Sequence, residues 1–155
     1  PLIYAGDEIG TLNEYSFLAD NDKKDDSRWA NRPKQDWATI EKLDKEKTYH
    51  SKLFKALQKL IGERKKHPVF ADGNNTVLYN SNNSHIFMYE RTSLKGNGVL
   101  VICNFDENVQ PIDRIQLGPY GTANKIKDLV SGKTVSIASE KLTILPFQLL
   151  WLVKK

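Results

Sequence analysis

The chain has 155 residues, of which 39% are hydrophobic and 27% charged, and this balance is that of a globular protein rather than a disordered one. The net charge of +4 is evenly divided, because residues 1–68 carry 14 basic and 12 acidic groups and residues 69–155 carry 9 and 7. A nucleic-acid binder would instead gather its basic residues on one face. No apolar run approaches the roughly 20 residues of a membrane helix. The single cysteine, Cys103, excludes an internal disulfide.

The first apolar segment, Pro1–Tyr4 with Ala5, predicts a short strand that ends at Gly6. A continuous apolar run of this kind is typical of a strand buried on both faces, as in a parallel sheet. One such strand needs neighbours, and the sequence begins with Pro1 rather than Met. We therefore expect the chain to be a piece of a longer protein.

Residues 7–47 form a long polar stretch, and a loop of this length inside a compact domain usually has a function. Its aromatic residues, which supply surface to bury, are Tyr15, Phe17, Trp29 and Trp37. A helix is predicted next, with Thr48 as its N-cap and its end near Lys66. His67-Pro68 stops it, because the residue before a proline avoids the helical region.

From residue 75 onwards the sequence consists of short apolar runs separated by turn residues such as Ser81-Asn82-Asn83 and Ser131-Gly132-Lys133. The predicted strands are 76–80, 84–91, 98–104, 109–117, 124–129, 134–137, 142–145 and 147–153. Short strands at this spacing are typical of an antiparallel sandwich or barrel.

Charged residues gather in the long polar stretch at Asp25, Asp26, Arg28 and Arg32. Taken alone, they suit either a solvated surface cluster or a site where a guanidinium holds a carboxylate and sugar hydroxyls. The three histidines lack metal-ligand spacing, and Cys103 lies in an apolar strand, so the sequence predicts no metal site.

Pro1–Gly10 reads Pro-Leu-Ile-Tyr-Ala-Gly-Asp-Glu-Ile-Gly and resembles the eighth barrel strand of α-amylase-family enzymes. In that family the strand ends in a Gly-Asp-Glu turn at the rim of the active site, where barrel enzymes build their sites. The resemblance gives Asp7 and Glu8 a structural role at the strand end. Adjacent strand residues point in different directions, so these two do not form a catalytic pair.

The segments Gly10–Asn13 and Asp25–Pro33 resemble the corresponding loop of amylosucrases and related sucrose hydrolases. In those enzymes an arginine of this loop pairs with an aspartate from early in the barrel and closes the pocket for one glucosyl unit. The resemblance implies this role for Arg28 or, as second choice, Arg32. The substrate-binding residues that it implies are Arg28, Arg32, Asp26, Tyr15 and Phe17.

Later segments extend the resemblance. Lys59–Pro68 is similar to the last barrel helix, and residues 128–133 and 145–152 are similar to the closing strands of the family's C-terminal β-domain. The resemblance implies a fragment of a (β/α)8 barrel at residues 1–68, comprising the last strand, the active-site loop and the last helix. An all-β antiparallel sandwich domain at residues 69–155 is expected to follow it.

The family implies a retaining enzyme, here one that transfers a glucosyl unit from sucrose to an α-glucan or to water. Its nucleophile, its acid/base and a third carboxylate come from strands four, five and seven. We therefore expect the catalytic residues upstream of Pro1, none in this fragment, and no activity of the fragment alone. No metal or other cofactor is implied.

The expected partner is a sugar, sucrose or α-glucan, bound through the parent enzyme, and neither nucleic acid nor a membrane is expected. The predicted helix presents an apolar stripe that includes Leu53, Leu57 and Leu60. Outside the parent enzyme this stripe would lose its neighbours, so we also expect the fragment to associate with itself.

Two alternatives remain. The parent could be an ordinary α-amylase or α-glucosidase, although the Asp25–Pro33 segment favours the sucrose branch. Alternatively, residues 69–155 could form a carbohydrate-binding module whose aromatic platform includes Phe87 and Tyr89, which share one face of a strand. Exposure of both rings would favour sugar binding, and burial of both would favour a structural domain.

Overall fold

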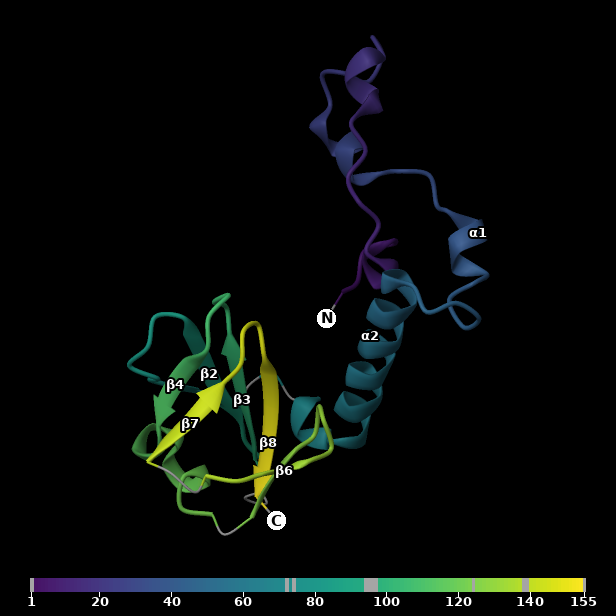
Figure 1. Cartoon of the computed structure of the whole chain (residues 1–155). Coiled ribbons are helices and arrows are strands. Elements are labelled where there is room, and N and C mark those ends of the chain that lie inside the picture. Colours follow the sequence, from purple (N-terminus) through teal and green to yellow (C-terminus); the bar gives the residue numbers. More distant parts are fainter. Residues whose placement is uncertain are drawn as a thin grey trace. The chain divides into compact units, whose positions relative to one another are not determined.

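The computed structural model describes residues 2–71, 73, 75–93, 98–123, 125–137 and 140–154. The chain divides into two compact units, residues 1–60 and 61–155, and the boundary falls within the sequence of the longest helix (Figure 1). The first unit is built from short helical turns, and the second from strands.

The first unit contains no strand among its described residues. Its elements are the 3-10 helices η1 (Asp7–Ile9), η2 (Ser16–Ala19) and η3 (Ser27–Asn31), the helix α1 (Trp37–Ile40) and the beginning of α2 (Tyr49–Lys66). The strand predicted at residues 1–5 is therefore wrong in this structure. A strand is held by hydrogen bonds to a neighbouring strand. Within the described residues no strand lies beside Leu2, Ile3 and Tyr4, which are exposed, and the carbonyl of Tyr4 instead accepts from the backbone N–H of Asp7 in the turn that follows.

The prediction of the long helix is confirmed. α2 begins at Tyr49, directly after Thr48, whose Oγ1 accepts a hydrogen bond of 3.2 Å from the backbone N–H of Ser51. It ends at Lys66, and Pro68 then starts the 3-10 helix η4 (Pro68–Phe70). In the part of the chain that the structure describes, no helix combines the length and the apolar character needed to cross a membrane.

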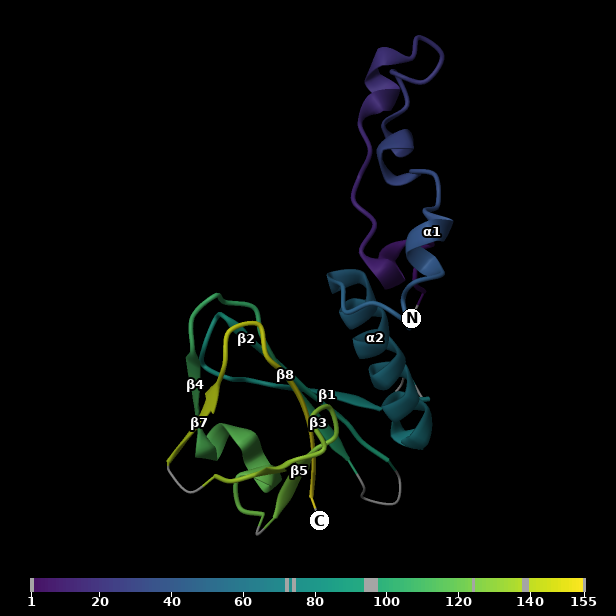
Figure 2. The same ribbon diagram turned by 45° about the vertical axis from the view of Figure 1, so that its right-hand side comes forward.

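The second unit is an antiparallel β-domain (Figures 1 and 2). Its larger sheet has the order β1-β2-β3-β8-β5-β6, its smaller sheet pairs β4 with β7, and each of these pairings is antiparallel. The strands are β1 (Thr76–Tyr79), β2 (Ile86–Arg91), β3 (Val99–Asn104), β4 (Gln110–Asp113), β5 (Ile126–Asp128), β6 (Thr134–Val135), β7 (Lys141–Ile144) and β8 (Leu149–Lys154).

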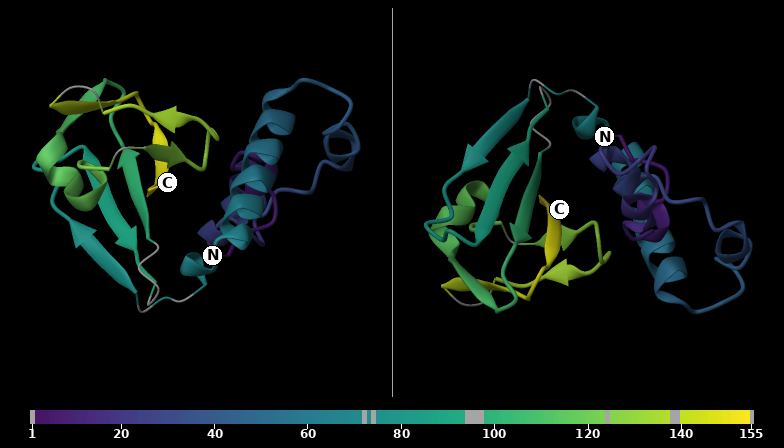
Figure 3. Two further views of the ribbon diagram at one scale, coloured as in Figure 1. Left: turned by 90° about the horizontal axis from the view of Figure 1, so that it is seen from below. Right: turned by 90° about the horizontal axis from the view of Figure 1, so that it is seen from above.

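Each predicted strand has a counterpart in the described residues, and the bounds differ by at most two residues except at the end of the run 109–117. The predicted run 109–117 leaves the sheet after Asp113 and continues as the 3-10 helix η5 (Arg114–Tyr120), the short green helix of Figure 3. Asp113 and Gln116 form a capping box that starts η5. The predicted run 147–153 begins only at Leu149, because Phe147 has a φ of 52°, which no strand residue adopts.

The main core lies between the two sheets and is closed at one end by η5. Alternating residues of the central strands β3 and β8 point into it, as the period of two in a strand requires. Its buried residues are Ile86, Met88, Leu100, Ile102, Ile112, Leu117, Tyr120, Ile126, Leu142, Ile144, Leu150 and Leu152.

The opposite face of the larger sheet is apolar as well, but it is covered over only part of its area. Val101 and Trp151 lie in a second cluster with Phe70 of η4, and the rings of Phe70 and Trp151 are 4.8 Å apart. Leu78 and Phe87, on the same face, are exposed.

Candidate functional site

A hollow of about 400 Å³ lies in the first unit, where η1 and the residues after it approach η3. Arg28 and Arg32, which the resemblance placed at a sugar site, line this hollow together with Asp7, which it gave a structural role at the strand end. Its other lining residues are Tyr4, Ala5, Gly6, Thr11, Leu12, Asn13, Asn31 and Pro33. The two segments are joined by a backbone hydrogen bond of 2.9 Å, which Glu14 donates to Ala30.

Two glycines shape the turn around η1. Gly6 and Gly10 have φ values of 102° and 67°, in the left-handed region that other residues avoid. The Glu8 carboxylate accepts a hydrogen bond of 2.8 Å from the backbone N–H of Gly6, so it is engaged by its own turn. Asp7, unlike Glu8, lines the hollow.

Arg28 is paired inside the loop. Its Nε and Nη2 donate to the two carboxylate oxygens of Asp26 at 2.7 and 2.8 Å, and its backbone N–H donates to Oδ1 at 3.0 Å. The guanidinium holds the pKa of Asp26 below its usual range, and the carboxylate raises the pKa of Arg28. The charge of Arg28 is therefore compensated locally, and Asp26 supports the arginine without lining the hollow itself.

Arg32 is held differently. Its guanidinium lies 5.8 Å from the centroid of the Trp29 ring, a cation–π contact that leaves the N–H donors at its edge available. Among the residues that the structure describes, no hydrogen bond or ion pair engages this guanidinium. Lys23 also lies over Trp29, at 5.3 Å, and pairs with Asp20 at 2.6 Å.

Tyr15 and Phe17 do not line the hollow. Phe17 is buried, and its ring centroid lies 6.5 Å from that of the exposed Tyr15. The Tyr15 hydroxyl accepts a hydrogen bond of 3.4 Å from Asn13, which does line the hollow. Tyr15 is therefore next to the hollow, whereas Phe17 anchors its loop.

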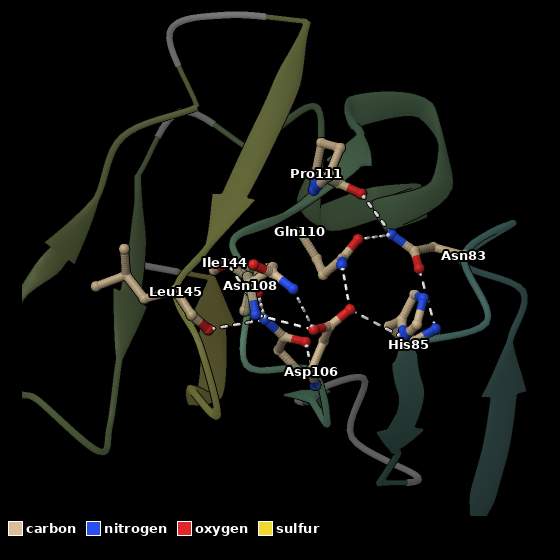
Figure 4. A network of polar contacts seen from close by, with 9 residues as sticks. Asn83, His85, Asp106, Asn108, Gln110, Pro111, Ile144 and Leu145 are labelled. Carbon is tan, nitrogen blue, oxygen red and sulfur yellow. Dashed lines mark hydrogen bonds and ion pairs between the residues drawn. The ribbon is translucent and has the colours of Figure 1, made fainter.

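A polar network at one end of the β-domain was not found from the sequence (Figure 4). The Asp106 carboxylate accepts from Gln110 Nε2 at 2.7 Å and from the Asn108 backbone at 2.9 Å, and it lies 3.0 Å from His85 Nδ1. These contacts hold the pKa of Asp106 below its usual range, the Asn108 backbone bond contributing most. Asn83 extends the network by donating to Gln110 at 2.9 Å.

The network joins three connections of the domain. Asn104, which is buried, donates to the backbone oxygens of Asn108 and Leu145, both at 2.9 Å, and so ties the end of β3 to the turn before β8. The only sequence signal was the density of Asn and Asp in these turns. Because its groups satisfy one another, we interpret the network as structural.

A second polar cluster lies beside the main core. The Glu90 carboxylate accepts from the hydroxyls of Tyr79 and Tyr120, each at 2.8 Å. Burial is the main reason that the pKa of both tyrosines is raised, and the hydrogen bond to this carboxylate is the second. The pKa of Tyr79 is raised to about 12, and that of Tyr120 is raised as well. Gly98 leaves room for the cluster, since a Cβ there would overlap the Glu90 carboxylate.

The hollow can therefore bind a polar ligand. Its lining residues carry a carboxylate, two guanidinium groups, amide side chains and two hydroxyls, the groups that recognise sugars and anions. In the described residues no group of three or more His, Cys, Asp or Glu side chains is arranged to hold a metal ion.

The fold defines the second unit as an antiparallel β-domain of two sheets. Residues 77–153 match the family described as "Amylosucrase, C-terminal domain". This part of the chain therefore resembles the amylosucrase C-terminal domains, and the resemblance inferred from its motifs is confirmed.

A curated relative matches nearly the whole chain. The glucosylglycerate phosphorylase of Escherichia coli is 28% identical over 153 residues, which are 98% of this chain and 25% of the relative. The chain thus spans about a quarter of the length of that enzyme.

Solved structures agree on the fold. AmyP in complex with maltose superimposes with a TM-score of 0.57 and 13% identity, over 70% of this chain and 22% of AmyP. A mutant of MutB, from crystals soaked with trehalulose, gives a TM-score of 0.51 and 19% identity over 75% of this chain and 19% of MutB. At these identities the likeness concerns the fold alone.

Proposed function

We propose that this chain is the C-terminal part of a retaining, α-glucoside-active enzyme of the amylosucrase type. The parent enzyme would transfer a glucosyl unit from sucrose to an α-glucan or to water. Residues 1–68 would complete its barrel, and residues 69–155 would form its C-terminal β-domain. The observation that carries the proposal is the hollow in which Asp7, Arg28 and Arg32 meet, in a chain whose residues 77–153 match the amylosucrase C-terminal family.

In this proposal the chain supplies binding, and the carboxylates that break the glycosidic bond lie upstream of Pro1. A retaining mechanism needs two carboxyl groups roughly 5–5.5 Å apart, one attacking the anomeric carbon and one protonating the leaving oxygen. Arg28, oriented by Asp26, would close the pocket by binding an upstream carboxylate and sugar hydroxyls. Glu8 would stabilise the turn that carries Asp7, through its hydrogen bond with the backbone N–H of Gly6.

A second candidate is phosphorolysis, in which phosphate replaces the glucan or water as the acceptor of the glucosyl unit. The relative that supports it is the glucosylglycerate phosphorylase, which matches 98% of this chain. Both candidates use the same retaining chemistry at the donor sugar and differ only in the second substrate.

The carbohydrate-binding alternative receives less support. Phe87 is 47% exposed, but Tyr89 is half-buried in the second cluster, so the two rings do not form an open platform. Two exposed rings, Phe105 and Phe147, remain near the end of the domain that holds the polar network. A structural role for the β-domain is therefore our proposal, and maltooligosaccharide binding that Phe87→Ala abolishes would contradict it.

The full-length protein should be tested with sucrose, with phosphate present or absent, while glucose, fructose, glucose 1-phosphate and polymer are followed together. Fructose release with polymer formation would support the amylosucrase reaction, and phosphate-dependent glucose 1-phosphate would support phosphorolysis. Cleavage of maltooligosaccharides without sucrose turnover would instead indicate an α-amylase or α-glucosidase.

Replacement of the pocket arginine sharpens this test. We expect Arg28→Ala to lower kcat/KM on the order of 10²-fold, since a misplaced pocket wall costs about that much. Lys34→Ala is the matched control, because it removes an exposed cation six positions away in the sequence that does not line the hollow. Equal activity of the two variants would refute the role of Arg28.

A further inference from the structure

A single side chain attaches the turn that carries Asp7 to the long helix. His50, in the first turn of α2, has its Nδ1 atom 2.6 Å from the backbone oxygen of Ile9, 41 positions earlier in the chain. Because a carbonyl oxygen only accepts hydrogen bonds, Nδ1 carries the proton and is the donor. η1 and the beginning of α2 lie side by side within the first unit (Figure 1). His50 thus joins two elements that are far apart in the sequence.

The turn around η1 is closed by its own backbone. The N–H groups of Ile9 and Thr11 donate to the carbonyl of Gly6 at 3.2 and 2.9 Å, and the N–H of Gly10 donates to the carbonyl of Asp7 at 3.1 Å. The side chain of Ile9 is also buried. A displacement of Ile9 would therefore be passed to Asp7, which lines the hollow two positions away.

The surfaces of the turn and the helix are shaped for close approach. A Cβ at Gly10 would lie 2.9 Å from Cδ2 of Leu53 and 3.7 Å from the Tyr49 ring, so a larger residue there would push the turn away from α2. The rings of Tyr49 and His50 lie against each other, with their centroids 3.7 Å apart. Contact with this ring restricts the rotation of the imidazole and keeps Nδ1 directed at Ile9.

We propose that His50 is a positioning residue of the hollow. Its hydrogen bond to Ile9 fixes the turn around η1 on α2 and thereby sets where the Asp7 carboxylate lies in the sugar pocket. His50 does not line the hollow itself, so it acts through the turn. The inference rests on the proposed function, because it names a further residue on which the same pocket depends.

Hydrogen exchange on the full-length protein tests the attachment without any substrate. His50→Ala should raise the exchange rates of the amides of residues 9–11 about tenfold, since the turn loses its hydrogen bond to the helix. His50→Asn should restore the protection, because its amide nitrogen stands as many bonds from Cα as Nδ1 and also donates. Lys52→Ala, at an exposed position of the same helix, is the control. Unchanged exchange in His50→Ala would overturn the proposal.

Turnover tests the consequence for the hollow. With sucrose or a maltooligosaccharide, whichever the wild-type enzyme cleaves, His50→Ala should lower kcat/KM about tenfold or more, because a displaced pocket wall slows the reaction. His50→Asn should stay close to the wild-type value. Equal kcat/KM in His50→Ala and Lys52→Ala would refute the positioning role.

A double-mutant cycle separates positioning from general destabilisation. If His50 acts through Asp7, His50→Ala should cost much less in an Asp7→Asn background than in the wild type. The same loss in both backgrounds would mean that His50 acts independently of Asp7, so the inference would fail and the proposed function would stand. If no α-glucoside is turned over, the proposed function fails, and the exchange measurement still decides whether His50 fixes the turn.

Discussion

In the loops of the first unit, polar side chains bind residues two or three positions away, as Asp26 does with Arg28 and Glu14 does with Ser16. In the β-domain, Asp128 reaches Trp151 and Glu90 reaches Tyr120, so contacts join strands that are distant in the sequence. Local contacts shape a loop without fixing it in a larger framework, whereas long-range contacts form only in the folded domain. The proposed binding residues thus lie in the unit that depends more on its neighbours.

The largest expected difference concerns the core of the β-domain. Leu100 of β3 is fully buried and Leu78 of β1 is 71% exposed, so Leu100→Ala should lower the free energy of unfolding by about 2–5 kcal/mol and Leu78→Ala by less than about 0.5 kcal/mol. Denaturant unfolding followed by circular dichroism measures both. Similar values for the two variants would show that the main core does not stabilise the domain.

The next largest effect should come from Asp128. Its buried carboxylate accepts three backbone hydrogen bonds, from Val130 and Trp151 at 3.0 Å and from Ser131 at 2.8 Å. Asp128→Ala leaves these donors unpaired and should lower the free energy of unfolding by about 2–3 kcal/mol. Glu107→Ala, at an exposed carboxylate, is the control, and an equally small change in both variants would contradict the assignment.

A smaller effect should appear at acid pH. The pKa of Asp106 is lowered in the folded domain, so between that value and the unfolded pKa of about 3.9 the unfolded state binds more protons. The stabilisation by Asp106 is therefore complete above pH 3.9 and is lost as the pH falls through the folded pKa. Asp106→Asn should make stability less steep with pH in this range, as unfolding at successive pH values would show. An unchanged slope would indicate that the stability of the domain does not depend on the charge of Asp106.

The smallest effect is expected at α2. Leu53 is exposed, and Leu57 and Leu60 are only half-buried, so we expect the 155-residue chain to associate weakly through this stripe. Sedimentation velocity at increasing concentration should show association that Leu57→Glu reduces, whereas Lys55→Glu, on an exposed position of the same helix, should not reduce it. A chain that stays monomeric at every concentration would contradict this prediction.

The sequence predicted best what short-range chemistry determines. Thr48 and Pro68 delimit α2 as expected, because a cap and a proline act within one turn. The strand at residues 1–5 failed because its partners, and not its own apolar residues, decide whether it forms. η5 contains a kink at Gly118, whose φ is 53°, whereas the sequence analysis predicted a strand up to residue 117.

For the candidate site, too, the sequence predicted which residues are involved but not the contacts that they make. Motifs selected Asp7, Arg28 and Arg32, and the hollow brings them together, but motifs could not show which arginine is already paired. Phe17 was proposed as a sugar contact, yet it is buried, because an aromatic residue in a polar loop can equally serve as its anchor. The roles of these residues in binding stay predictions.

The contact of two tyrosine hydroxyls with one carboxylate gives the β-domain an optical signal of its own. Of the six tyrosines in the chain, Tyr79, Tyr89 and Tyr120 have raised pKa values, and the two that contact Glu90 are Tyr79, at about 12, and Tyr120. Both would return to about 10 on unfolding, so stability present below pH 10 is lost as the pH rises toward 12. Phenolate absorbance should therefore rise late and abruptly with alkali, at the moment when the strands around Glu90 separate, and this would follow the domain without any added label.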